Sequence, residues 1–218
     1  MEKRKEDMKV TIASLASLAL LGLIAAVCHG QDFSADVTYD SAPTLDASSR
    51  PALPPTSSKL YLSKDKMRLE SQGLSDTIML VDFANHTATI LFPSQKAYQD
   101  LAAGPEQYFR VTDAEDACPD WQKAVGKPMT CSKVGNEVVD GRQAVKYEGK
   151  GASATGSSTF LWIDPALKFV TKWQDADGGA ELHNIKEGPQ PADLFAVPPR
   201  YDVLKPRKKP VGKAPRPK

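Results

Sequence analysis

The chain has 218 residues, of which 41% are hydrophobic, and its 28 Lys and Arg residues nearly balance its 27 Asp and Glu residues. This length and composition are typical of one globular domain with a buried core. Only two cysteines and two scattered histidines follow the first 30 residues, so a cysteine-based zinc site is not expected.

The first thirty residues have the pattern of a secretory signal peptide. Four basic residues precede an uncharged, mainly apolar run over 10–27, and small residues lie near its end. We therefore expect residues 1–30 to be removed by cleavage after Gly30, which leaves a periplasmic or secreted protein. The alternative is an uncleaved anchor, because a run of 18 residues has the minimum length for spanning a bilayer.

Cys28 lies at the end of this apolar run and raises the question of lipid attachment. A lipobox has a small residue immediately before its cysteine, where this chain has Val27. It has a leucine- or valine-type residue three positions before the cysteine, where this chain has Ala25. We therefore expect Cys28 to be lost with the signal peptide, and lipidation of Cys28 is the second possibility.

Two cysteines, Cys118 and Cys131, remain after cleavage. An even number of cysteines in an exported chain predicts a disulfide. The bond would close a short loop and contribute about 3 kcal/mol to stability in the chain-entropy treatment. The alternative is a pair of free thiols.

Alternation of apolar and polar residues predicts short strands in the rest of the chain. The stretch FSADVTYD, residues 33–40, alternates as a half-buried strand does. Residues 41–58 are rich in Pro, Ser and Ala and have no periodicity, which predicts a long loop. Further strands are predicted over 59–64, 66–72, 77–83 and 87–93.

The alternation is lost over 94–130 and then returns. Segments 98–109 and 113–125 are predicted to form one or two short helices near the cysteine pair, with Asp113 as an N-cap. Later strands are predicted over 133–139, 142–149, 157–164, 167–174 and 181–186.

Turn signals separate these later strands. Asp140-Gly141 is a strong signal for a two-residue hairpin, and Asp175 and Asp177 belong to a predicted hairpin turn rather than to a calcium loop. Residues 191–195 are predicted to form one helical turn that starts at Pro191. The chain is therefore expected to be mainly β (α+β), with about ten antiparallel strands that have one apolar and one polar face.

Six stretches together resemble the outer-membrane lipoprotein carrier (Lol-like) superfamily, and in particular its uncharacterised secreted and periplasmic relatives. They are QDFSADV, KLYLSKDKMRLE, ATILFPSQKAYQDL, VVDGRQAVKYE, TFLWIDPALKFVTKW and PADLFAVPPRY. The resemblance implies that residues 31–204 form a half-barrel, a single curved antiparallel sheet with a few short helices covering one side. It also implies an apolar concave face, which receives acyl chains in the best-known members.

Strand parity gives the candidate residues that line this concave face. They are Val37, Tyr39, Leu60, Leu62, Met67, Leu69, Ala88, Ile90, Phe92, Phe160, Trp162, Phe169 and Trp173. The first hypothesis is an exported, non-enzymatic binding protein that holds a lipid or a lipoprotein acyl chain there. The alternative is that these side chains fill a core, and that the protein is an envelope-associated structural or sensor module.

Motifs for catalysis and cofactor binding are missing from the sequence. His86 and His183 share no acid–base pattern, and there is no nucleophile elbow, Walker A motif or dinucleotide fingerprint. We therefore expect no catalytic residues, no metal and no cofactor.

The last fourteen residues, 205–218, differ in charge from the domain before them. They carry seven Lys and Arg residues, four prolines and no acid, whereas residues 31–204 carry 17 basic and 24 acidic residues. This composition predicts a disordered basic tail. Its expected partner is an anionic envelope surface, with an inert solubilising tail as the alternative. The tail has no aromatic residues, so no nucleic-acid partner is expected.

Overall fold

A computed structural model gives the structure of most of the expected domain. It describes residues 31–41, 58–71, 76–102, 104, 106–151 and 157–204. The predicted signal peptide with Cys28, most of the predicted loop over 41–58 and the basic tail over 205–218 lie outside the described residues.

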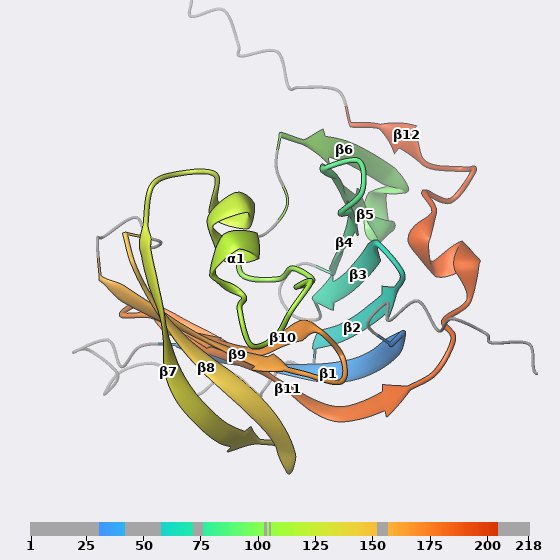
Figure 1. The fold of residues 1–218 in the computed structure, drawn as a ribbon. Coiled ribbons are helices and arrows are strands. Elements are labelled where there is room, and N and C mark those ends of the chain that lie inside the picture. Colours follow the sequence, from blue (N-terminus) through green and yellow to red (C-terminus); the bar gives the residue numbers. More distant parts are fainter. Residues whose placement is uncertain are drawn as a thin grey trace, which may run out of the picture.

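The described residues form a single sheet of twelve strands (Figure 1). Its strands are β1 Phe33–Ser41, β2 Ser58–Ser63, β3 Lys66–Ser71, β4 Thr77–Asp82, β5 Thr87–Phe92, β6 Ala97–Leu101, β7 Thr130–Val139, β8 Arg142–Lys150, β9 Ser158–Asp164, β10 Phe169–Gln174, β11 Gly178–Glu187 and β12 Asp202–Val203. Their order across the sheet is β12-β6-β5-β4-β3-β2-β1-β11-β10-β9-β8-β7. The predicted fold class, a mainly β protein with one curved sheet, is confirmed.

Two runs of hairpins build this sheet, and β1 joins them. β1 pairs antiparallel with β2 on one side and with β11 on the other, so an early strand and a late strand meet at the centre. Register shifts interrupt the ladders of β1, β10 and β7, and such bulges bend strands. Figure 1 shows the result, a sheet that curls into a trough with α1, Cys118–Val125, on its concave side.

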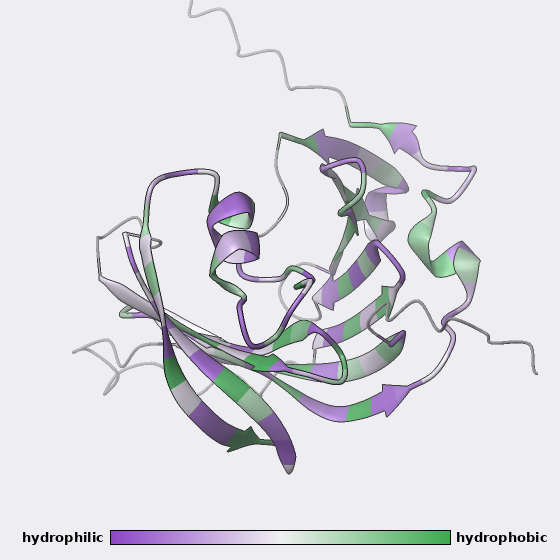
Figure 2. Ribbon diagram, viewed as in Figure 1, coloured by the Kyte–Doolittle hydropathy of each residue, from purple (hydrophilic) through white to green (hydrophobic). Residues whose placement is uncertain are grey.

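Alternating burial along the strands follows the alternation in the sequence. In β2, Leu60 and Leu62 are buried, while Lys59, Tyr61 and Ser63 between and beside them are partly exposed. Figure 2 shows the same alternation as bands of opposite hydropathy on β2 and β3. On β2, one face therefore builds the core and the other is partly exposed, as predicted, whereas Leu80 and Leu91 on the outer face of β4 and β5 are buried as well.

The core inside the trough has two parts. In the first part, the rings of Tyr108 and Phe169 stack at 6.2 Å, and Phe33 meets Phe169 edge-on at 5.6 Å. In the second part, Trp121 of α1 packs on the inner side chains of β8, β9 and β10. Gly149 of β8 permits this contact, because a Cβ there would lie 2.5 Å from the Trp121 ring.

Some expectations for the middle of the chain are wrong. Tyr98 and the residues up to Leu101 belong to β6, not to a helix, because they complete ladders with β5 and with the parallel strand β12. The expected helix over 113–125 starts only at Cys118, with Pro119 in its first turn, and Ala117 is its N-cap residue. Asp113 instead closes a local turn by accepting the Glu115 N–H at 2.9 Å.

The turn predictions are confirmed. Asp140 and Gly141 both have positive φ, 47° and 76°, as a two-residue hairpin turn requires. Asp175 Oδ1 accepts the Asp177 and Gly178 N–H groups within the β10–β11 turn. The helical turn η2, Ala192–Phe195, begins directly after Pro191, and the other short helical turn, η1, covers Pro93–Gln95.

Candidate ligand-binding cleft

Side chains fill the central part of the trough. Among the residues predicted to line the concave face, those that pack in the first part of the core are Val37, Leu60, Leu62, Met67, Leu69, Ala88 and Phe169. Phe169 has no exposed surface, and Leu69 is only 7% exposed. The structure therefore places these residues in a packed core.

The other predicted lining residues are not among the buried members of this part of the core. Ile90 and Phe92 are half-buried on β5, and Trp173 is half-buried between the two parts of the core. Tyr39, near the end of β1, is 45% exposed.

Phe160 and Trp162 lie on the outer face of the sheet, which differs from the expectation. Lys146 Nζ lies 4.7 Å from the Trp162 ring centroid and 5.2 Å from that of Phe160. Trp162 Nε1 donates a hydrogen bond to Glu137 at 2.7 Å. The run FLWID has apolar side chains at both parities, so alternation does not identify the inward face of β9. Leu161 and Ile163 are the inward residues.

An open cleft of about 400 Å³ lies beside the filled centre. α1, the β4–β5 hairpin and the segment 102–110 form its walls. The apolar side chains that line it are Val81, Phe83, Ala102, Tyr108, Phe109, Ala124 and Val125. Its charged or titratable lining residues are Asp82, His86, Glu106, Arg110, Asp120 and Lys123. None of the residues predicted from strand parity lines this cleft.

Several of the charged groups at the cleft are engaged by the protein itself. Asp82 accepts hydrogen bonds from the backbone N–H and the side-chain amide of Asn85, at 2.9 and 3.0 Å. The backbone bond is the main reason why the pKa of Asp82 lies below its usual range. Asp120 accepts the Thr112 N–H at 2.6 Å. These carboxylates therefore stabilise the walls.

Arg110 fastens the segment 102–110 to the sheet. Its guanidinium donates hydrogen bonds to the carbonyl oxygens of Lys64, Leu167 and Gln31. Burial lowers the pKa of Arg110, while Asp32, 3.7 Å away, opposes that shift. Since these bonds come from three separate parts of the chain, Arg110 fixes the backbone beside Tyr108 and Phe109.

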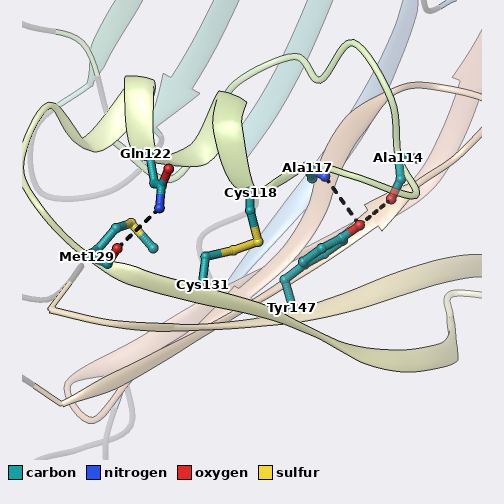
Figure 3. Close-up of a disulfide and its surroundings, with 7 residues drawn as sticks. All are labelled: Ala114, Ala117, Cys118, Gln122, Met129, Cys131 and Tyr147. Carbon is teal, nitrogen blue, oxygen red and sulfur yellow. Dashed lines mark hydrogen bonds between the residues drawn. A yellow bond between two sulfur atoms is a disulfide. The ribbon is translucent and has the colours of Figure 1, made fainter.

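A disulfide holds the helical wall of the cleft (Figure 3). Cys118 of α1 and Cys131 of β7 are bonded with a Cα–Cα distance of 5.6 Å, which confirms the predicted pairing. Beside it, Tyr147 Oη donates to the Ala114 carbonyl at 2.9 Å and accepts the Ala117 N–H at 3.3 Å. Gln122 Nε2 donates to the Met129 carbonyl at 3.2 Å. These contacts tie α1 to β7 and β8.

His183 belongs to a cluster of polar side chains on the outer face of the sheet. Its Nε2 lies 2.9 Å from Thr38 Oγ1, and its Nδ1 lies 3.3 Å from Asp140 Oδ1. Asp140 also accepts the Asn184 N–H at 3.0 Å. These contacts fasten the β7–β8 turn to β11 on the opposite face of the sheet from the core. His86, by contrast, borders the cleft.

Two further features are absent from the described ranges. No group of three or more His, Cys, Asp or Glu residues there is arranged to hold a metal ion. No helix in this part of the chain combines the length and the apolarity needed to cross a bilayer.

Comparison with protein-family models found no match, and comparison with curated proteins found none either. Solved structures with a similar fold exist. A structure of PNGF-II shares 10% sequence identity at a TM-score of 0.51, over 80% of this chain and 31% of that chain. This chain thus spans about a third of that protein. An uncharacterised conserved protein from Thermus thermophilus shares 10% identity at a TM-score of 0.50, over 80% of this chain and 90% of that chain.

A domain from Vibrio parahaemolyticus, described as an outer membrane lipoprotein-sorting protein, shares 11% identity at a TM-score of 0.32. The match covers 75% of this chain and 89% of that chain. The predicted half-barrel, a single curved sheet, rests on the strand order of the structure itself. At such low identities, these likenesses concern the fold alone.

Proposed function

We propose that the protein is a non-enzymatic binding protein of the cell envelope that holds an apolar chain, such as the acyl chain of a lipid or lipoprotein. The observation that carries the proposal is the cleft beside α1. Its volume of about 400 Å³ falls in the range of small-molecule sites, and apolar side chains lie beside polar ones in its walls. That combination suits a ligand with a long apolar part and a polar end.

The physical chemistry of the cleft favours such a ligand. Each methylene removed from water contributes about 0.8 kcal/mol, so a chain of about eight methylenes gains roughly 6 kcal/mol before the cost of immobilising it. Asp82 and Asp120 accept hydrogen bonds from backbone N–H groups of the protein. The Arg110 guanidinium donates to backbone carbonyl oxygens, among them that of Leu167. Apolar contact is therefore available along the walls, and His86, Glu106 and Lys123 also line the cleft.

A location outside the cytoplasm is part of the proposal. The Cys118–Cys131 disulfide supports it, because structural disulfides persist in oxidising compartments. The signal-peptide pattern of residues 1–30 supports it independently. Mass measurement of the N-terminus of the exported protein tests it. A chain that begins at Gln31 is expected, and a lipid on Cys28 would instead show an anchored protein.

Blocking the cleft tests the binding proposal. Dodecylpyrene is a fluorescent alkyl probe, and its emission reports transfer from water to an apolar site. Ala102 is exposed and lines the cleft, so Ala102→Trp is expected to weaken probe binding at least tenfold by filling it. Ala166, exposed in the β9–β10 turn, provides the control Ala166→Trp, which should bind as the wild type does. Equal binding by both variants, or no binding by the wild type, would contradict the proposal.

The filled centre of the trough favours a second candidate, an envelope-associated scaffold or sensor module. Seven of the thirteen residues expected to line a concave site pack in the core instead. The same assay separates the two candidates, because a scaffold without a ligand gives no saturable probe signal in the wild type.

A further inference from the structure

The basic tail leaves the described part of the chain close to the cleft. β12 runs parallel to β6 (Figure 1), and directly after it the Leu204 N–H donates to the Tyr98 carbonyl at 2.7 Å. β6 continues from Tyr98 to Leu101, and Ala102, the next residue, lines the cleft. Because a strand rises about 3.3 Å per residue, the chain leaves β6 roughly 13 Å before the cleft and runs towards it.

The positive charge of the tail begins at this point. Lys205 directly follows Leu204, and Arg207, Lys208 and Lys209 come next, so four of the seven basic residues lie in the first five positions. An extended chain spans at most about 3.5 Å per residue, so these four residues stay within about 18 Å of Leu204. A surface that binds them is therefore held beside the cleft rather than at the end of a long tether.

Three turns of the sheet meet at the cleft and form what we call the cleft end. Arg110 joins the β2–β3 and β9–β10 turns, because it donates to the carbonyl oxygens of Lys64 and Leu167. The β4–β5 turn is joined to them through the Phe83 N–H, which donates to the Asp65 carbonyl at 2.7 Å. The exposed charged side chains at this end and on the cleft walls have both signs and include Lys64, Lys66, Lys123, Asp65 and Glu106. Since these charges largely cancel, an anionic surface does not strongly repel the cleft end.

The opposite end of the sheet, which we call the far end, is acidic. It consists of the β5–β6 and β10–β11 turns, the end of β1 and the start of β4. Its acidic residues are Asp40, Asp76, Asp175 and Asp177, whereas Lys96 is the basic residue of the β5–β6 turn. Like charges repel within about one Debye length, roughly 10 Å at 0.1 M salt, so an anionic surface repels the far end. The tail and the charges of the domain thus favour the same orientation.

We propose that the cleft end faces an anionic bilayer when the tail is bound, so that the walls of the cleft lie beside the lipid head groups. In this orientation an apolar ligand passes between the bilayer and the cleft without crossing open solution. The inference goes beyond the proposed function, because it names the surface through which the protein meets the membrane. It holds or fails whichever ligand the cleft takes.

A dye placed at either end of the sheet tests this orientation. Ala84 is exposed in the β4–β5 turn and Ala176 is exposed in the β10–β11 turn, so Ala84→Cys and Ala176→Cys form a matched pair. Cys118 and Cys131 are bonded to each other, so the introduced cysteine is the free thiol to which nitrobenzoxadiazole is attached in a chain of residues 31–218. Phosphatidylglycerol vesicles that contain some lipids with a nitroxide on the head group quench a dye that lies at their surface.

The dye at Ala84→Cys is expected to be quenched roughly threefold more than the dye at Ala176→Cys, because only the cleft end lies at the surface. Phosphatidylcholine vesicles with the same nitroxide lipid should quench neither dye. Equal quenching at the two positions, stronger quenching at Ala176→Cys, or none at either position would overturn the inference. Binding of dodecylpyrene without vesicles decides the proposed function separately.

Charge reversal at the far end tests the electrostatic cause of the orientation. Asp76 and Asp177 are exposed, so Asp76→Lys/Asp177→Lys should fold as the wild type does. This change removes the repulsion, and the ratio of quenching at the two dye positions should fall below about 1.5. The control Asp65→Lys/Glu106→Lys makes the same change in net charge at the cleft end and should keep or raise the ratio. An unchanged ratio in the far-end variant would overturn the inference.

Discussion

At the scale of single residues, Arg110 does the most to shape the cleft. Its bonds to the carbonyl oxygens of Lys64 and Leu167 join the β2–β3 turn to the β9–β10 turn. The next residue, Val111, donates its N–H to the Lys168 carbonyl at 2.9 Å. The aromatic pair Tyr108-Phe109 is thereby fixed between the filled core and the cleft.

Removing this guanidinium should destabilise the fold. Arg110→Met keeps much of the apolar length of the side chain but leaves partly buried carbonyl oxygens without their charged donor. Because hydrogen bonds to charged groups contribute about 1.5–3 kcal/mol each, a loss of about 2–3 kcal/mol in the free energy of unfolding is expected in urea titrations. Arg200→Met, at an exposed position, is the control and should stay within about 0.5 kcal/mol of wild type. If the two variants unfold at the same urea concentration, Arg110 does not have this role.

The sequence indicated the strands and the helix that border the cleft, but not the cleft itself. Strand alternation identifies side chains on the same face of a sheet, whereas Tyr108, Phe109 and Arg110 lie outside the named strands and helices, in a part of the sequence without periodicity. The partners of Arg110 are backbone carbonyls from distant turns, and no side-chain pattern encodes such contacts. Alternation did identify Val37, Leu60 and Leu62 as inward-facing, but it could not distinguish a packed core from an open cavity.

At the scale of elements, α1 is a short helix that depends on its attachments. It has eight residues, no side-chain hydrogen bond at its N-cap, and two buried side chains, Trp121 and Val125. A helix of this length is not stable alone in water. Its position as a cleft wall therefore depends on the Cys118–Cys131 bond, on Trp121 and on the αL cap at Gly126.

Loss of the disulfide should loosen this wall before it unfolds the sheet. The double variant Cys118→Ser/Cys131→Ser is expected to lose about 3 kcal/mol of stability in the chain-entropy treatment. Hydrogen exchange should increase first over residues 113–130, because the sheet keeps its own ladders. Reduction of wild-type protein should reproduce the effect, and the double variant should not respond to reductant. Uniformly faster exchange across β1–β5 would contradict a local role for the bond.

Prediction of the elements succeeded where the pairing was local. The hairpins β2–β3, β4–β5 and β7–β8 have short turns and clear alternation, so they could be located from the sequence. β6 and β12 could not, because β6 completes its pairing with a strand of two residues that lies about a hundred positions later. The residues Tyr98–Leu101 appeared helical because local preference is weak, and the ladder with β5 overrides it.

At the scale of the whole molecule, β1 makes one curved sheet out of two hairpin arrays. Because it pairs with both β2 and β11, the concave sides of the arrays face the same interior. Alternation indicated most of the strands, whereas no local pattern indicates the pairing of β1 with β11, because these strands lie far apart in the sequence. The interior created in this way holds the packed core.

Charge is distributed unevenly over the expected mature chain. Residues 31–204 have an excess of seven acidic residues, whereas residues 205–218 carry seven basic residues and no acid. An anionic surface would therefore repel the domain and attract the tail. Each basic residue near such a surface contributes about 1 kcal/mol, so seven are sufficient for reversible attachment at low salt.

Vesicle binding tests this role of the tail. A chain of residues 31–218 is expected to co-sediment with vesicles that contain phosphatidylglycerol and to stay in solution with phosphatidylcholine vesicles. Residues 31–204 alone should not bind, and neither should the full chain with its seven tail Lys and Arg residues replaced by Gln. Raising the salt from 0.1 M to 1 M should release the bound protein, because the Debye length falls from about 10 Å to about 3 Å. Equal binding with and without the tail would contradict this role and would place the membrane contact on residues 31–204.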